Sequence, residues 1–237
     1  MKRYLPHLWN PSESISPIES GSIMTSGEMP TYSKDLDRLL VPQLGSPGLI
    51  NAWEPGNLSS GSTTYSTYPM YYGVHGLRWE DNKLWWIKGD QNSSLDGRWS
   101  AGIGNVFTTG LPSGGDIVPL PDMNRAVLIG QRWGSAVASY MVVDIITGES
   151  LFYVAGHGDS YGGCFRIGTT SKVVVFDHQK TNIRVVDATD GSYQDIYVGP
   201  TIKYRSGVYY QGKCICLPWN AANWTDFNCG ILTIDLG

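Results

Sequence analysis

The stretch VVDIITG at residues 142–148 returns almost unchanged as VVDATDG at residues 185–191, and a shorter echo, TIDLG, occupies residues 233–237. The β-branched residues in each stretch favour an extended strand. The aspartate that follows can accept hydrogen bonds from the next backbone amides, and the glycine supplies a positive φ. Each stretch is therefore predicted to be a strand that runs into a tight hairpin turn.

The segments around these stretches repeat as well. ESLFYVAG (149–156) and SYQDIYVG (192–199) follow the first two stretches and are predicted to be return strands. Two short apolar runs precede each stretch, so the repeating unit has four strands. The first run of each unit is DIVPLPD (116–122), GGCFRIG (162–168) or SGVYYQG (206–212). The second run is AVLIGQ (126–131), KVVVFDHQ (172–179) or KCICLPW (213–219).

The repeat has the length of a propeller blade. Asp144, Asp187 and Asp235 follow one another at intervals of 43 and 48 residues, and self-similar four-stranded units of about 40–50 residues are typical of β-propellers. Over residues 68–237 the chain resembles a β-propeller of no specific family, since it lacks the Gly-His and Trp-Asp pairs of WD40 blades and any kelch pattern. The resemblance implies an all-β fold of four to five four-stranded blades, and five are favoured because five such units nearly fill 237 residues.

The earlier part of the chain can be aligned with the same template. GLRWEDNKLWWIKGD (76–90) predicts two strands around a turn, and RWSAGIGNVFTTG (98–110) completes that blade. GLINAWEPG (48–56) and STTYSTYPMYY (62–72) are expected to be outer strands of a first, degenerate blade. One helical pattern is visible, at residues 33–40, where Ser and Asp stand at capping positions and leucines share one face.

The first 47 residues differ from the rest and hold six of the 13 prolines. They are predicted to be an extended arm (1–47) ahead of the propeller (48–237), and their spaced apolar residues suit an arm that lies along a neighbour. The final stretch has no return strand, so its backbone edge needs a cover. We expect a segment within residues 1–70 to pair with the strand at 232–235.

Composition excludes several classes of partner. The net charge is −4 with 16% charged residues, and no basic stripe is present to neutralise the phosphates of a nucleic acid. No apolar run approaches the length of a membrane span, so no membrane insertion is expected, and the N-terminus lacks the apolar core of a secretion signal. The four cysteines are expected to be small buried residues, with a Cys216–Cys229 bridge as the alternative, and no metal or cofactor is expected.

No catalytic motif is present. The chain lacks GxSxG, P-loop, HExxH and GxGxxG patterns. His157 lies in AGHGDSYGG beside Asp159 and Ser160, but groups this close in sequence cannot converge as a triad, and a turn is the simpler interpretation. A propeller glycoside hydrolase is the enzymatic alternative, which needs two facing carboxylates. Its possible donors are Asp116, Asp122, Asp159 and Asp177.

Aromatic residues point instead to binding. The chain has nine tryptophans, and several lie in or beside segments that join the second and third strands of a blade or join successive blades. In a propeller these connections emerge on one face. Such a face suits a protein interface or a sugar, while the alternative is that the rings pack the loops down. The candidate binding residues are Trp99, Trp133, His157, Tyr161, Arg205, Trp219 and Trp224.

In style the chain resembles structural proteins of tailed-phage virions, which combine an extended arm with a Gly-, Tyr- and Trp-rich β-domain. The resemblance implies a non-enzymatic structural or attachment subunit, located in a virion after synthesis in the host cytoplasm. Its partners would be other structural proteins or copies of itself, with a glycan as a further candidate. The alternatives are a carbohydrate-binding lectin and the glycoside hydrolase.

Overall fold

The structure is a computed structural model of the whole chain. It describes residues 31–33, 35–43, 48–54, 63–68, 74–81, 83–88, 97–101, 106–109, 115–131, 138–157, 163–177, 180–197, 203–210, 212–219 and 232–235.

The described strands form five antiparallel sheets that follow one another along the chain. The first sheet contains β1 (Thr31–Ser33), β2 (Arg38–Gln43), β3 (Gly48–Trp53) and β4 (Thr63–Tyr68). The second contains β5 (Val74–Glu80), β6 (Lys83–Lys88), β7 (Gly97–Ala101) and β8 (Val106–Thr109). The third contains β9 (Asp116–Leu120), β10 (Arg125–Gln131), β11 (Ala138–Asp144) and β12 (Ser150–Ala155), with the 3-10 helix η2 (Pro121–Met123) between β9 and β10.

The fourth sheet contains β13 (Cys164–Arg166), β14 (Lys172–Val175), β15 (Asn182–Asp187) and β16 (Tyr193–Tyr197). The fifth contains β17 (Lys203–Tyr210), β18 (Lys213–Trp219) and β19 (Leu232–Asp235). In every sheet the strands pair in chain order. The expectation of an all-β chain built from four-stranded antiparallel units is therefore confirmed for four sheets, and the fifth has three described strands.

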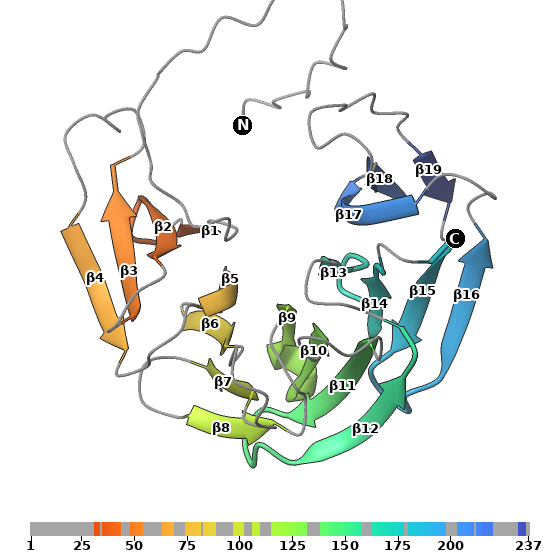
Figure 1. Ribbon diagram of the computed structural model, residues 1–237, viewed down its shortest axis with the longest axis horizontal. Coiled ribbons are helices and arrows are strands. Elements are labelled where there is room, and N and C mark those ends of the chain that lie inside the picture. The colour runs from red at the N-terminus through yellow and green to blue at the C-terminus, as the bar shows by residue number, and fades with distance from the viewer. Residues whose placement is uncertain are drawn as a thin grey trace, which may run out of the picture.

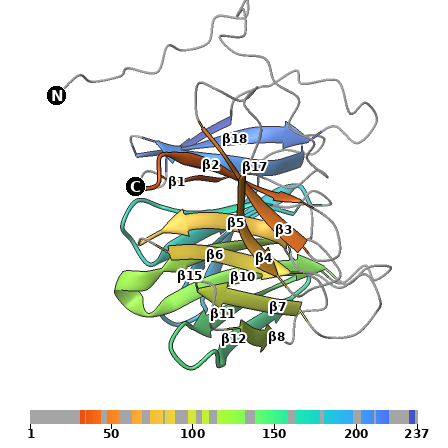
Figure 2. The same ribbon diagram turned by 90° about the vertical axis from the view of Figure 1, so that its left-hand side faces the viewer.

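The sheets stand side by side around a common centre (Figure 1). The first strand of each sheet is innermost, and β1 lies beside β5, β5 beside β9, β9 beside β13, and β13 beside β17. The fourth strands lie at the rim. Figure 2 shows the strands running from one face of the molecule to the other. The first and fifth sheets are the two ends of this series.

The two long repeats fold into the same turn. Asp144 Oδ1 accepts hydrogen bonds from the amides of Ile146 and Thr147, both at 2.8 Å, and Asp187 Oδ1 accepts one from Thr189 at 2.9 Å. These backbone donors hold the pKa of Asp144 below its usual value. The glycines that close the turns have φ values of 76° (Gly148) and 75° (Gly191), as the sequence predicted.

A charge pattern accompanies the repeat. The basic residue that begins the second strand faces the acidic residue that ends the third: Arg125 faces Asp144, Lys172 faces Asp187 and Lys213 faces Asp235. In the first sheet Arg38 Nη2 lies 3.0 Å from Glu54 Oε1 at the corresponding place. The third echo therefore occupies the same position in its sheet as the two longer ones.

The central strands are buried on both faces. Along β10, Val127 and Ile129 join an apolar cluster with the fourth sheet, while Ala126 and Leu128 join another with the second sheet. Alternate residues of a strand point to opposite faces of its sheet. The third sheet therefore needs both of its neighbours to cover its apolar side chains.

A third apolar cluster joins the fourth sheet to the fifth. Phe165, Val174 and Phe176 pack there with the buried thiol of Cys214. Cys164 and Cys214 are buried, as expected of small apolar residues. The side chains of Cys216 and Cys229 are outside the described residues, so the alternative disulfide stays a prediction.

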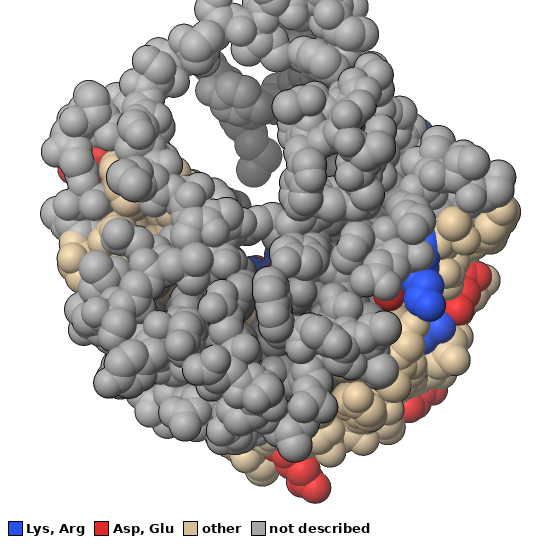
Figure 3. Space-filling model, viewed as in Figure 1, with Lys and Arg blue, Asp and Glu red and all other residues tan. Residues whose placement is uncertain are grey.

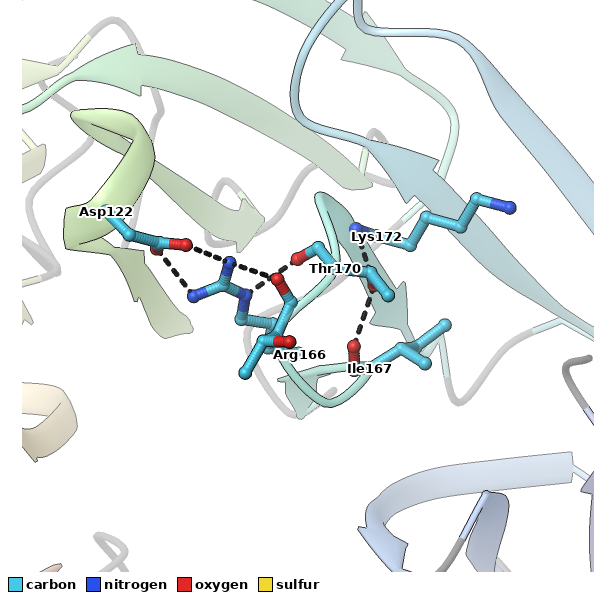
Figure 4. A network of polar contacts seen from close by, with 6 residues as sticks. Asp122, Arg166, Ile167, Thr170 and Lys172 are labelled. Carbon is cyan, nitrogen blue, oxygen red and sulfur yellow. Dashed lines mark hydrogen bonds and ion pairs between the residues drawn. The ribbon is translucent and has the colours of Figure 1, made fainter.

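A surface ion pair joins the third and fourth sheets at their first turns (Figure 4). Arg166 donates from Nη1 and Nη2 to the two carboxylate oxygens of Asp122, each at 2.7 Å, and from Nε to the carbonyl of Thr170 at 2.7 Å. Arg166 thereby lowers the pKa of Asp122. The Asp122 side chain is 55% exposed, so solvent screens this pair and its effect on stability is small.

The prediction of a helix at residues 33–40 is wrong. Ser33 and Asp37 serve a hairpin turn instead: Ser33 Oγ accepts from the amide of Leu36 at 3.2 Å, and Asp37 has a φ of 48°, which ends any helical path. Arg38 then begins β2. The strands β1 and β2, within the expected arm, thus belong to the first sheet, and residues 1–30 lie outside the described residues.

The expected pairing of residues 1–70 with β19 is not made by the strands described between 31 and 68. The strands β1 to β4 pair only among themselves, and β19 pairs with β18. In the part of the chain that the structure describes, no helix has the length and hydropathy needed to cross a membrane.

Replacing Gly191 by alanine should destabilise the fold by about 1–2 kcal/mol from the left-handed backbone alone. A further loss is expected because a Cβ there would lie 2.6 Å from Cγ of Phe152 in the preceding sheet. Urea unfolding of Gly191→Ala, alone and combined with Phe152→Ala, separates the two effects. The steric part should vanish in the Phe152→Ala background, and a Gly191→Ala protein as stable as wild type would contradict the assignment.

Candidate functional site

The strand order brings one set of chain connections to a single end of the molecule. Consecutive strands of each sheet are antiparallel, so first strands start, and second strands end, on the same side. We call this side the connector end and define it by the starts of β5, β9, β13 and β17 and the ends of β6, β10, β14 and β18. The segments that join second to third strands, and those that join successive sheets, begin and end there.

The described backbone places four of the predicted binding residues near the connector end. Trp99 is the third residue of β7 and Arg205 the third of β17, both counted from that end. Trp219 is the last residue of β18, and His157 follows the end of β12. The structure does not describe the side chains of Trp99, Arg205 and Trp219. Outside the described residues altogether lie Trp133, Tyr161 and Trp224.

His157 is an internal residue. It is only 1% exposed, and its Nε2 lies 3.2 Å from the carbonyl oxygen of Val175. A carbonyl oxygen only accepts, so Nε2 carries the proton and donates it, which leaves Nδ1 without a proton in the neutral ring. A partner at the surface would not touch this imidazole, so its role is inside the junction of the third and fourth sheets.

A charged group lies close enough to this histidine to affect its pKa. Arg184 donates from Nε and Nη2 to the two oxygens of Asp195, at 2.7 and 2.8 Å. Its guanidinium also stands 3.7 Å from the ring centre of Tyr193 and 6.0 Å from that of Tyr140. We call these four residues and His157 the His157 cluster. Figure 3 shows basic and acidic side chains close together over β15 and β16 at the rim.

Burial and charge set the protonation of the His157 cluster. Desolvation lowers the pKa of His157, and the positive charge of Arg184 adds to this, while the hydrogen bond to Val175 and the charges of Asp177 and Asp195 act in the opposite direction. Desolvation also raises the pKa of Tyr140 to about 12, and its buried Oη has no hydrogen-bond partner among the residues that the structure describes. Arg184 lowers the pKa of Asp195. The cluster thus combines a neutral imidazole and phenol with one ion pair.

A second polar group links the inner strands of three sheets. Asp116, at the start of β9, accepts hydrogen bonds from Arg78 of β5 and from the amide of Cys164 in β13, the latter at 3.0 Å. The amide of Ile117 donates to its other oxygen at 2.8 Å. Arg78 also donates to the carbonyl of Cys164. Burial raises the pKa of the Cys164 thiol, which keeps it protonated.

The structure describes three of the four aspartates that the glycoside hydrolase alternative would use. Asp116 is bound by Arg78 and Asp122 by Arg166, and Asp177 is buried. Asp159 lies outside the described residues. Among the residues that the structure describes, no three His, Cys, Asp or Glu side chains gather as metal ligands would.

Comparison with known proteins supports the fold alone. No family model and no curated protein match the chain. Among the solved structures that match is a chain in the crystal structure of a mitotic checkpoint complex, with a TM-score of 0.59 and 11% identity over 80% of this chain. The chain spans 58% of the length of that match. The likeness is consistent with a propeller-like fold.

The sequence analysis did not predict the three arginine–aspartate pairs, although one of them could have been predicted. Arg184 and Asp195 face each other in the β15–β16 hairpin, so their pairing follows once the turn at VVDATDG fixes the register. The other two pairs join different sheets. Their partners are separated by 38 residues (Arg78 and Asp116) and by 44 (Asp122 and Arg166), so only an alignment of whole sheets could reveal them.

The buried His157 should make the fold sensitive to acid. Because its folded pKa lies below the ordinary value of about 6.5, the unfolded chain binds the proton more tightly. This contribution to stability is complete above the unfolded pKa and is lost as the pH falls towards the folded pKa. Replacing His157 by glutamine removes the titrating group and retains an N–H donor for the Val175 carbonyl.

Urea unfolding over a pH series from neutral to mildly acidic measures the effect. The free energy of unfolding of wild type should fall more steeply below the ordinary histidine pKa than that of His157→Gln. Parallel curves for the two proteins would show that the buried imidazole does not drive the acid response.

Proposed function

We propose that the chain is a non-enzymatic attachment or assembly subunit, folded as a five-bladed β-propeller, that binds its partner through the connector end. The single observation that carries the proposal is the chain topology. Apart from the buried His157, the predicted binding residues lie either in strands near the connector end or in segments whose flanking strands reach it.

The described core supports the propeller part of the proposal. Five sheets follow one another around a centre, and strands such as β10 are apolar on both faces because both neighbouring sheets cover them. A propeller is the architecture in which every sheet has two such neighbours. The buried bridge made by Asp116 at the start of β9 joins the inner strands of adjacent sheets at the connector end.

The residue types at the connector end favour a protein partner. Tryptophan, tyrosine and arginine dominate the binding energy of protein interfaces, where large rings add contact area at small entropic cost. Within this proposal the chain is a component of a virus particle, and residues 1–30 reach a neighbouring subunit. Its first partner is another copy of itself. Carbohydrate binding by the same rings is the competing outcome of the test below.

Trp133→Ala and Trp219→Ala test the connector end, and Tyr153→Ala is the matched control because Tyr153 is a 51% exposed aromatic residue on the outer strand β12. Sedimentation velocity over a concentration series should show self-association of wild type and of the control. Each tryptophan variant should weaken it about ten-fold or more, as expected for an aromatic anchor, with an unchanged melting temperature.

A glycan array with the same proteins provides the second readout. A monomer at every concentration that binds a glycan, and loses it in the tryptophan variants, would replace the assembly role by that of a lectin. Equal self-association of all four proteins would remove the connector end as the binding surface.

A further inference from the structure

The fifth sheet differs from the other four in its described strands. It has the order β17-β18-β19, whereas each of the others has four strands. The strand β19 is equivalent to the third strands β11 and β15, because Asp235 faces Lys213 as Asp144 faces Arg125 and as Asp187 faces Lys172. By this equivalence, the far edge of β19 corresponds to the edges that β12 and β16 occupy elsewhere.

Among the described strands, none pairs with that edge of β19. On its other side β19 pairs with β18 from Leu232 to Asp235, opposite Cys216 to Lys213. The far edge of a strand carries its own row of N–H and C=O groups, which template the addition of another strand. In the third and fourth sheets, return strands of six and five residues satisfy the same groups.

We infer that a stretch within residues 1–30 of the same chain adds to this edge as the fourth strand of the fifth sheet. Thirty residues precede β1, which belongs to the first sheet, and the first and fifth sheets are the two ends of the series. At about 3.3 Å per residue such a segment reaches far beyond the roughly 18 Å radius of gyration of a compact chain of this length. Because the segment is covalently linked to β1, its effective concentration at the edge is about 1 mM.

The composition of the segment fits an outer strand. RYLPHLW at residues 3–9 is rich in aromatic and branched residues, and its proline is tolerated only where one N–H faces away from the sheet. An added strand of about five residues uses a small part of the segment. The remainder can still contact a neighbouring subunit, so this pairing does not depend on the proposed function.

Hydrogen exchange measured by mass spectrometry tests the pairing in the full chain. At concentrations where the protein is monomeric, the amides of residues 232–235 should exchange slowly. Deletion of residues 1–30 should speed their exchange by about ten-fold or more, while the amides of β16, an outer strand of the neighbouring sheet, keep their rate. A synthetic peptide of residues 1–30, added in excess, should restore the slow exchange.

A second variant tests the pairing if the deletion variant does not fold. Leu8→Pro, Ile18→Pro and Ile23→Pro together keep the chain length, remove three N–H donors, and should also speed exchange at β19. Unchanged exchange at β19 in whichever variants fold would overturn the proposal. So would protection that grows with concentration in step with dimer formation, because the strand would then come from a second copy. Trp133→Ala should leave β19 protected, which separates this result from a failure of the connector end.

Discussion

The carboxylate of Asp116 is the point on which the arrangement of the sheets depends. Its side chain is 3% exposed, and a buried charge is stable only when it is paired and hydrogen bonded. Arg78 of the second sheet supplies the opposite charge, and Cys164 of the fourth sheet supplies an amide. One carboxylate thus sets the relative positions of the inner strands β5, β9 and β13. The apolar faces farther from the centre can then meet without polar groups between them.

Much of the fold follows from the sequence because the hairpins are local. The stretch VVDIITG contains the strand, the hydrogen-bond acceptor and the positive-φ residue of its own turn, so the strands on either side could be predicted with it. The incorrect prediction of a helix at 33–40 also came from local sequence. A serine at a capping position and leucines at helical spacing also suit a hairpin, and the strand β3 that selects the hairpin is separated from Ser33 in sequence.

The candidate site was harder to predict from the sequence than the fold. The residue His157 lies in a glycine-rich stretch typical of an exposed turn, yet it is buried against Val175, because burial in a connection depends on the neighbouring sheet rather than on local sequence. The topology does explain why residues as distant as Trp99 and Trp219 are expected at one end. Antiparallel pairing in chain order sends every second-to-third connection to the same side, whatever its sequence.

The most direct test compares Asp116→Asn with Asp122→Asn, since both aspartates pair with an arginine of another sheet but only Asp116 is buried. Loss of Asp116 leaves Arg78 without its counter-ion. The expected destabilisation is about 2–4 kcal/mol, below the cost for a fully buried pair because the Arg78 side chain is 32% exposed. For Asp122→Asn about 0–1 kcal/mol is expected, as for other exposed pairs. Similar small losses of unfolding free energy in the two variants would contradict the central role of Asp116.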